Sequence, residues 1–206
     1  MNILVLGATG RVGSQIVTYA LQDRHHVIVL VRSPEKIQMD NENLTIITGN
    51  VLNKEDIVRA MYGIDIVISA LNTDGTTTLS GSMPLIIEAM ENEGIKRIIT
   101  IGTAGILQSK TTPNSLRYQS SESKQKSTRA AKEHHKVYDM LKQSTLDWTI
   151  VCPTYLPDGE KVGRYRIDRN FLPDGGAKIS VVDTADFTYK QIKASTYIKS
   201  RVGIAY

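Results

Sequence analysis

The stretch NILVLGATGRVG, residues 2–13, decides the fold because it joins an apolar run to regularly spaced glycines. Residues 3–6 are short, unbroken and apolar, as in a strand that is buried on both faces of a parallel sheet. Gly7, Gly10 and Gly13 follow at the spacing G-x-x-G-x-x-G. The pattern predicts a strand, a tight turn and a helix, which is the arrangement that binds the diphosphate of a dinucleotide.

Each glycine has a physical reason. Gly7 lets the chain leave the strand where a Cβ would clash, Gly10 lets the backbone approach a diphosphate, and Gly13 lets the helix pack closely on the strand. The helix start then offers free N–H groups and the positive end of its dipole to the phosphates. The alternative is a βα turn without a ligand, but the buried strand before it and the amphipathic helix after it favour nucleotide binding.

The composition is that of an ordinary globular domain. The chain has 206 residues, of which 41% are hydrophobic and 22% charged. No apolar run is long enough to cross a membrane, and the glycine turn is too near the start to follow a cleaved signal peptide. We therefore expect one domain over residues 1–206, in the cytoplasm, as a monomer or weak homodimer. The single cysteine, Cys152, lies in an apolar run and is expected to be a buried structural thiol.

The positive charge is concentrated in one segment. The formal net charge is +4, and residues 109–145 hold eight Lys or Arg against three Asp or Glu. A basic segment can indicate nucleic acid, but no aromatic platform accompanies this one. A solvated face, or a rim that attracts an anionic cofactor, is favoured, and neither a nucleic-acid nor a membrane partner is expected.

Strands and helices keep alternating along the chain, which predicts a three-layer, doubly wound parallel sheet of the Rossmann-like α/β class. The expected strands after the first are residues 26–31, 44–48, 64–71, 97–101 and 147–151, with helices over 53–62, 83–93 and 127–142. Residues 72–82 are expected to be a loop, with Ser82 capping the following helix.

The last quarter of the chain is less regular. Residues 154–182 contain three glycine turns, a short extended piece at 164–167 and a strand-like run at 178–182. Asp183 is expected to cap a helix that reaches residue 194, before a last strand at 201–205. Residues 154–182 fall beyond the carboxyl ends of the strands, so we expect a short substrate lid there.

The residues after the second strand predict the form of the cofactor. An NAD-selective site places an acid there to bind the ribose 2′-hydroxyl, whereas this chain has Arg32 and Ser33, with Arg11 nearby in the glycine turn. Guanidinium groups pair with phosphate oxygens, so these residues favour the 2′-phosphate of NADP(H). The alternative is that both arginines are solvated surface groups.

Several stretches together resemble the atypical short-chain dehydrogenase/reductase superfamily, in the NAD(P)H-binding group that contains flavin reductase (biliverdin-IXβ reductase) and the NmrA-like proteins. The resemblance covers nearly the whole chain and is carried by residues 7–13, 32–33, 49–51, 69–71, 103–104, 146–151 and 153.

The resemblance implies a set of cofactor contacts: Gly7, Thr9, Gly10, Arg11, Val12, Arg32, Ser33, Asn50, Val51, Ala70, Leu71, Thr103, Pro153, Thr154 and Tyr155. Thr103 matches the active-site serine or threonine of the family, and the family usually has Asp at position 50. The Tyr-x-x-x-Lys pair of the dehydrogenases is absent, because Thr128 stands four residues before Lys132.

Two functions remain open at this stage. The first is an NADPH-dependent reductase that transfers hydride to a flavin, a quinone or a similar flat acceptor, with Thr103 and Tyr155 as candidate catalytic residues. For Thr103 a satisfied strand-end hydroxyl is the alternative, and for Tyr155 a plain pocket wall. The second function is an NADP(H)-binding redox sensor of the NmrA-like type. His134 and His135 diverge on a helix, and no cluster has metal-ligand spacing, so no metal site is expected.

Overall fold

The structure is a computed structural model that describes residues 1–73, 75–123 and 127–206. Its strands are β1 (Asn2–Leu6), β2 (His26–Val31), β3 (Leu44–Thr48), β4 (Ile66–Ser69), β5 (Arg97–Ile101), β6 (Asp147–Pro153), β7 (Arg166–Arg169) and β8 (Ser200–Ala205). Its helices are α1 (Arg11–Gln22), α2 (Lys54–Met61), α3 (Thr78–Asn92), α4 (Arg129–Gln143) and α5 (Val181–Lys190), with 3₁₀ turns η1 (Pro34–Lys36), η2 (Ala104–Ile106) and η3 (Arg117–Gln119).

The strands form one sheet in the order β3-β2-β1-β4-β5-β6-β8-β7. All neighbours are parallel except β7, which runs antiparallel to β8. The direction of winding reverses between β1 and β4, which is where an open sheet of this kind binds its ligand. The expected doubly wound α/β fold is confirmed.

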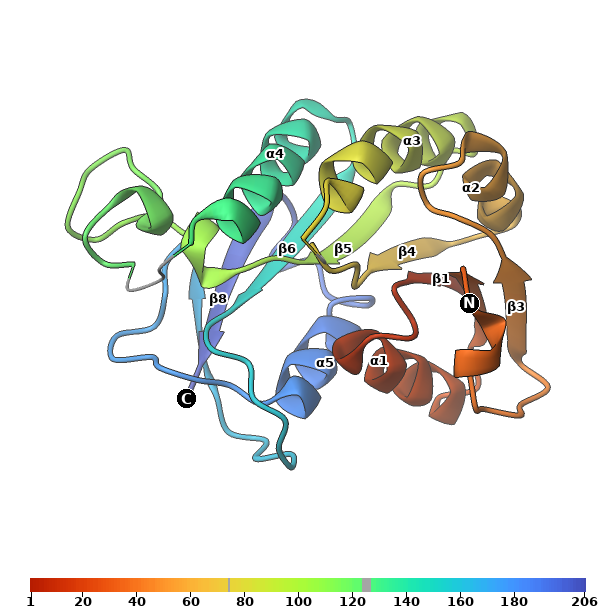
Figure 1. Ribbon diagram of the computed structural model, residues 1–206. Helices are drawn as coiled ribbons and strands as arrows, with labels where there is room; N and C mark the ends of the chain where they lie inside the picture. The colour runs from red at the N-terminus through yellow and green to blue at the C-terminus, as the bar shows by residue number, and fades with distance from the viewer. Residues whose placement is uncertain (74, 124–126) are drawn as a thin grey trace.

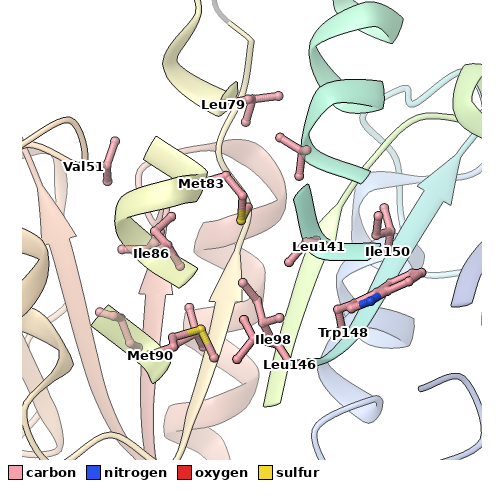
Figure 2. Close-up of a cluster of buried hydrophobic side chains, with 14 of the residues drawn as sticks. Val51, Leu79, Met83, Ile86, Met90, Ile98, Leu141, Leu146, Trp148 and Ile150 are labelled. Atoms are coloured by element: carbon pink, nitrogen blue, oxygen red, sulfur yellow. The ribbon is translucent and has the colours of Figure 1, made fainter. Parts of the chain in front are cut away.

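Helices cover both faces of the sheet (Figure 1): α2, α3 and α4 lie on one face and α1 and α5 on the other. Alternate strand residues point to opposite faces, so Leu4 and Leu6 join one buried cluster while Ile3 and Val5 join the other. Figure 2 shows the cluster under α3 and α4, where Met83 and Trp148 are among the packed side chains. Two apolar layers therefore hold the carboxyl edge of the sheet in a fixed position.

Helix α3 begins earlier than the sequence predicted. Ser82 does not cap it: Thr77 is the capping residue, and Ser82 is buried inside the helix. Leu79 is 3% exposed and packs in the same cluster as Met83, so the apolar stripe of the helix extends one turn further back. Burial of Leu79 explains why the threonine-rich segment is helical from Thr78 onward.

Helix α5 also differs at its start. The run at 178–182 is not a strand, apart from one bridge between Tyr155 and Lys178, and the helix begins at Val181. Ser180 caps it by accepting a hydrogen bond from the N–H of Asp183 at 3.0 Å. The expectation that Asp183 is the cap was wrong, because the buried Val181 belongs to the first turn of the helix.

The segment expected to form the lid, residues 154–182, contains a strand of the sheet. Its extended piece forms β7, at residues 166–169 instead of 164–167, and this strand extends the sheet beside β8. The predicted parallel sheet is thus extended by β7, an antiparallel edge strand that the sequence did not indicate. Within the described ranges, every helix is too short or too polar to cross a bilayer.

Asp183 ties the segment after β6 to α5. Its buried carboxylate accepts hydrogen bonds from the N–H groups of Val162 and Gly163, from the Ser180 hydroxyl and from the Tyr206 hydroxyl. Burial alone would raise the pKa of Asp183, but these hydrogen bonds outweigh it and hold the pKa below its ordinary value. The carboxylate therefore stabilises the fold in its ionised form.

We expect Asp183→Asn to lower the free energy of unfolding by about 1–3 kcal/mol at pH 7, because a buried charge-assisted network is lost. A lowered folded-state pKa gives stability above the unfolded pKa that is lost as the pH falls through the folded value. The difference between variant and wild type should therefore shrink below about pH 4. Urea unfolding at pH 7 and pH 3 measures it, with the exposed Glu160→Gln as control. A difference that does not change with pH would contradict the ionised network.

Candidate functional site

The glycine turn between β1 and α1 has no room for larger residues at two of its positions. Gly7 has a φ of +81°, and a Cβ there would lie 2.5 Å from the carbonyl oxygen of Ala70. A Cβ on Gly13 would lie 2.2 Å from the carbonyl oxygen of Gly7. Gly10 donates its N–H to that same oxygen at 3.0 Å, which closes the turn. Helix α1 can approach the strand this closely only because Gly13 lacks a side chain.

The start of α1 is prepared for an anion. Gly10 caps the helix with extended backbone and no side-chain hydrogen bond, and no acidic residue lies in the first turn. The first N–H groups of a helix have no partner within the helix. They carry the positive end of the helix dipole, so they can bind a diphosphate. These features fit the cofactor expected from the sequence.

The first cavity lies at the carboxyl ends of β1, β2, β3 and β4 and has a volume of about 250 Å³. Its lining residues are Gly7, Thr9, Gly10, Leu30, Val31, Arg32, Gly49, Asn50, Val51, Ala70, Leu71, Asn72 and Thr78. Eight of the residues expected to contact the cofactor are therefore brought to one cavity: Gly7, Thr9, Gly10, Arg32, Asn50, Val51, Ala70 and Leu71. These residues lie just after four separate strands, β1, β2, β3 and β4.

Asn50 is held in place by its own neighbours. Its N–H donates to Asp56 Oδ2 at 2.8 Å, and its Oδ1 accepts from the N–H of Leu52 at 3.0 Å. A Cβ on Gly49 would lie 2.7 Å from Asp56 Cγ, so the glycine is what lets this carboxylate reach the turn. The rigid turn sets the position of Asn50 and Val51 against the cavity.

Arg11, Val12 and Ser33 are not among the residues that line either cavity. Arg11 turns away from Arg32: its Nη1 donates to Asp158 Oδ1 at 2.9 Å and to the carbonyl of Leu156 at 3.1 Å. Both side chains of the Arg11–Asp158 pair are largely exposed, so the pair adds little stability. Its effect is to join the start of α1 to the segment after β6.

The second cavity follows β5 and β6, the next strands along the same edge, and has a volume of about 650 Å³. Its lining residues are Thr103, Ala104, Gly105, Arg117, Tyr118, Glu122, Ser123, Ser127, Thr128, Ala130, Ala131, Pro153, Thr154, Tyr155, Leu172, Gly175, Gly176 and Ala177. The remaining expected contacts, Thr103, Pro153, Thr154 and Tyr155, all lie here. Leu172 and residues 175–177 show that part of the expected lid does wall this cavity.

Hydroxyl groups in this cavity have hydrogen-bonding capacity to spare. Thr103 Oγ1 accepts the N–H of Gly105 at 3.4 Å, which leaves its own O–H to donate. Thr154 Oγ1 is buried and has no hydrogen-bond partner among the residues that the structure describes. A buried, unpartnered polar atom is costly, so its presence at a cavity fits a polar ligand group there.

The backbone of Tyr155 is held by a hydrogen bond, whereas its ring is exposed. Its carbonyl accepts the N–H of Ile179 at 3.0 Å, and its side chain is 69% exposed. The ring of Tyr155 thus lies at the solvent-exposed rim of the second cavity.

Cys152 is not a redox group. It is fully buried, and burial raises the pKa of its thiol to about 12, so it stays protonated.

The histidine side chain of His135 forms a hydrogen bond with the Tyr118 hydroxyl, at 2.9 Å from Nδ1 to Oη. Among residues 1–73, 75–123 and 127–206, no group of three His, Cys, Asp or Glu side chains could hold a metal ion.

Sequence reasoning missed several lining residues. Asn72 and Thr78 were expected in a loop and given no cofactor contact, and Arg117, Tyr118 and Glu122 were given no part in the site. Leu79 at the apolar spacing of α3 was the available signal for Thr78. No local signal exists for the others, because they come from irregular segments far apart in the chain.

Comparison with known proteins agrees with this arrangement. The NAD(P)H-binding family matches residues 7–195. The chain belongs to this family. It therefore belongs with proteins that bind a nicotinamide cofactor, and the predicted superfamily is confirmed.

Relatives of the family include reductases. A proposed NADH-flavin reductase from Streptococcus pneumoniae TIGR4 is 26% identical with a TM-score of 0.82, over 100% of this chain and 99% of that one. ChuY, an anaerobillin reductase from Escherichia coli O157:H7, shares the fold at 20% identity and a TM-score of 0.83. The alignment covers 100% of this chain and 97% of that one.

A curated relative matches about half of the chain. Photosystem II assembly factor Ycf39 from Synechocystis is 36% identical over 107 residues, which are 48% of this chain and 32% of that protein. The match thus spans about a third of the length of the relative.

The distinct roles of the glycines give a test of the cofactor site. We expect Gly10→Ala to fold, because its φ of −83° suits alanine, and to lose a few degrees in melting temperature, because its Cβ would lie a tight 3.2 Å from the carbonyl oxygen of Gly7. The added methyl would stand where the diphosphate approaches, so affinity for NADP⁺ should fall at least about tenfold. Calorimetric titration measures this.

Gly159→Ala is the matched control, since its Cβ would make an ordinary contact at 3.7 Å with Ser180 Cβ. Unchanged NADP⁺ affinity in folded Gly10→Ala would contradict the assigned diphosphate site.

Proposed function

We propose that the protein is an NADPH-dependent reductase that transfers hydride to a small flat acceptor such as a flavin or a quinone. One observation carries the proposal: a glycine-lined cavity and a larger cavity lie on consecutive strands along one edge of the sheet. The first cavity suits the adenosine and diphosphate part of the cofactor. The second suits a nicotinamide and a second planar molecule.

The 2′-phosphate preference rests on Arg32. It lines the first cavity directly after β2, where an NAD-selective site carries an acid. Arg11 lies apart from it, bonded to Asp158, so the selection is assigned to Arg32, with Ser33 as its neighbour in the turn. Arg11 instead orders the segment after β6.

The protein needs to supply little beyond orientation. A bound nicotinamide would supply the hydride, and the role of the protein would be to hold ring and acceptor face to face. The Thr103 hydroxyl can donate to the carboxamide or to the acceptor, and the unpartnered Thr154 Oγ1 offers a second polar contact.

The proton for the acceptor can come from solvent. Thr128 and Lys132 do not form the Tyr-x-x-x-Lys pair: Thr128 lines the second cavity, and Lys132 is exposed on α4. A flavin or quinone accepts hydride at an electron-poor atom, so solvent or the exposed Tyr155 can complete the reaction. The absent pair is therefore compatible with catalysis.

The activity is tested with NADPH and the acceptors FMN, FAD and simple quinones. We expect acceptor-dependent NADPH oxidation, and we expect Thr103→Ala to lower kcat about tenfold or more while the affinity for NADPH changes little. Ser127→Ala, in the same cavity wall, is the control. Tight NADPH binding with no oxidation by any acceptor would instead indicate the redox-sensor function.

The cofactor preference is tested by Arg32→Asp. Loss of the cation, together with an acid placed to bind a ribose 2′-hydroxyl, should shift the ratio of Kd values from NADPH toward NADH by roughly 100-fold. Arg24→Asp is the control, because it lies before β2 at the opposite edge of the sheet. The same cofactor ratio in Arg32→Asp as in wild type would refute this role of Arg32.

A further inference from the structure

The second cavity has an ion pair in its wall. Arg117 and Glu122 come from the segment between η2 and α4, and both line the cavity beside Thr103 and Thr154. Arg117 Nη1 lies 3.2 Å from Glu122 Oε1, and the two side chains are 17% and 13% exposed. They are the only charged residues among the described residues that line this cavity. What they can bind therefore depends on which of them has unused hydrogen-bonding capacity.

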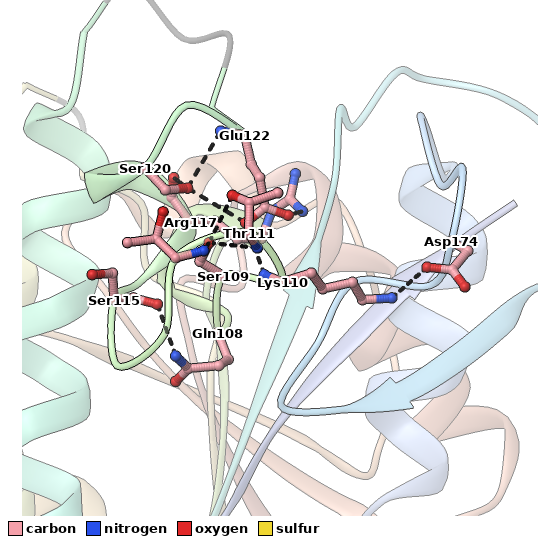
Figure 3. A network of polar contacts seen from close by, with 10 residues as sticks. Gln108, Ser109, Lys110, Thr111, Ser115, Arg117, Ser120, Glu122 and Asp174 are labelled. Atoms are coloured by element: carbon pink, nitrogen blue, oxygen red, sulfur yellow. Dashed lines mark hydrogen bonds and ion pairs between the residues drawn. The ribbon is translucent and has the colours of Figure 1, made fainter.

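Glu122 has none to spare. Its Oε2 accepts the N–H of Lys110 at 3.0 Å and the hydroxyl of Ser120 at 3.4 Å, and its Oε1 accepts from Arg117 (Figure 3). Burial alone would raise its pKa, but these hydrogen bonds and one from Ser109 lower it, so Glu122 is ionised. Glu122 is a fixed counter-ion within the protein.

Arg117 does have capacity to spare. Within the described part of the chain, only Nη1 takes part in a side-chain hydrogen bond, so most of the donors of the guanidinium are unused there. The other guanidinium nitrogens are not among the buried atoms that lack a partner, so solvent in the cavity reaches them. A guanidinium that is oriented by one carboxylate, lines a cavity and has donors to spare is suited to bind a second anion bidentately.

The loop that carries Arg117 is anchored at both sides. The Arg117 N–H donates to the carbonyl of Leu107 at 2.8 Å. Lys110 Nζ lies 2.5 Å from Asp174 Oδ1, which links this loop to the segment with Leu172 on the far wall (Figure 3). Arg117 is thus presented from a braced wall and needs little reordering to bind a ligand.

We propose that Arg117 determines acceptor specificity by binding an anionic substituent, a carboxylate or a phosphate, on the flat acceptor. This inference rests on the proposed reductase function and adds the substrate class to it. The rest of the wall suits the rings of such a molecule, because Ala130, Ala131, Pro153 and Leu172 are apolar. The acceptor would lie with its ring near Thr103 and its anionic group at Arg117.

The test compares acceptors that share a ring system and differ in charge. FMN and riboflavin have the same isoalloxazine, and only FMN carries a phosphate; a naphthoquinone with and without a carboxylate forms the second pair. We expect the KM of wild type for the anionic member of at least one pair to be about 10- to 100-fold lower, as for a charge-assisted hydrogen bond. Arg117→Gln should raise that KM to the value of the neutral member and leave kcat largely unchanged.

Controls separate this role from a structural one. Arg117→Lys should restore part of the preference, and Lys142→Gln, which removes an exposed cation from the end of α4, should leave it intact. The preference of wild type should also weaken at high salt, a measurement that needs no variant. Equilibrium titration of FMN and riboflavin with NADP⁺ bound gives a readout independent of turnover.

The outcomes distinguish the two proposals. NADPH oxidation in which neither anionic acceptor is preferred, or in which Arg117→Gln weakens charged and neutral acceptors equally, overturns the role of Arg117 and leaves the reductase function standing. A raised Kd for NADPH in Arg117→Gln assigns the residue to the cofactor and also overturns the inference. If no acceptor is reduced and FMN binds no more tightly than riboflavin, both proposals fail.

Discussion

The close approach of α1 to the end of β1 is the constraint on which the site depends. The contact exists because Gly13 has no side chain, since a Cβ there would lie 2.2 Å from the carbonyl oxygen of Gly7. Bringing the helix this near places its unpaired N–H groups at the carboxyl edge of the sheet, beside the point where the winding reverses. A longer separation would leave the dipole of α1 directed at solvent instead of at a ligand.

From that contact the cavities follow by the order of the strands. Parallel strands all end at one edge, so the residues after β1, β2, β3 and β4 must meet, and those after β5 and β6 must lie next to them. The two buried layers, on opposite faces of the sheet, keep these strand ends in register. The Arg11–Asp158 pair then joins the start of α1 to the segment that follows β6. The close contact between α1 and the end of β1, together with the order of the strands, thus accounts for the arrangement of both cavities.

How much was predictable depends on whether the signal was local. The strand ends, the glycine turn and Arg32 are each encoded in a few consecutive residues, and the structure gathers them in one cavity. The errors lie where distant burial decides: Leu79 makes α3 helical from Thr78, and Val181 turns a strand-like run into the start of α5. The direction of β7 depends on its pairing with β8, which no local pattern records. Sequence reasoning therefore predicts the cofactor half of the site better than the acceptor half.

The basic segment shows how structure changes the meaning of a charge run. Lys110 pairs with Asp174, Arg117 with Glu122, and Lys136 with Glu133, which is itself buried and bonded to the Ser80 hydroxyl. Two of these pairs fix the loop between η2 and α4, and the third lies within α4, where Glu133 also accepts a hydrogen bond from Ser80 on α3. Arg117 differs from the other two because its pairing faces a cavity. Among these three paired cations, Arg117 is therefore the one whose place in the fold suits it to meet a substrate.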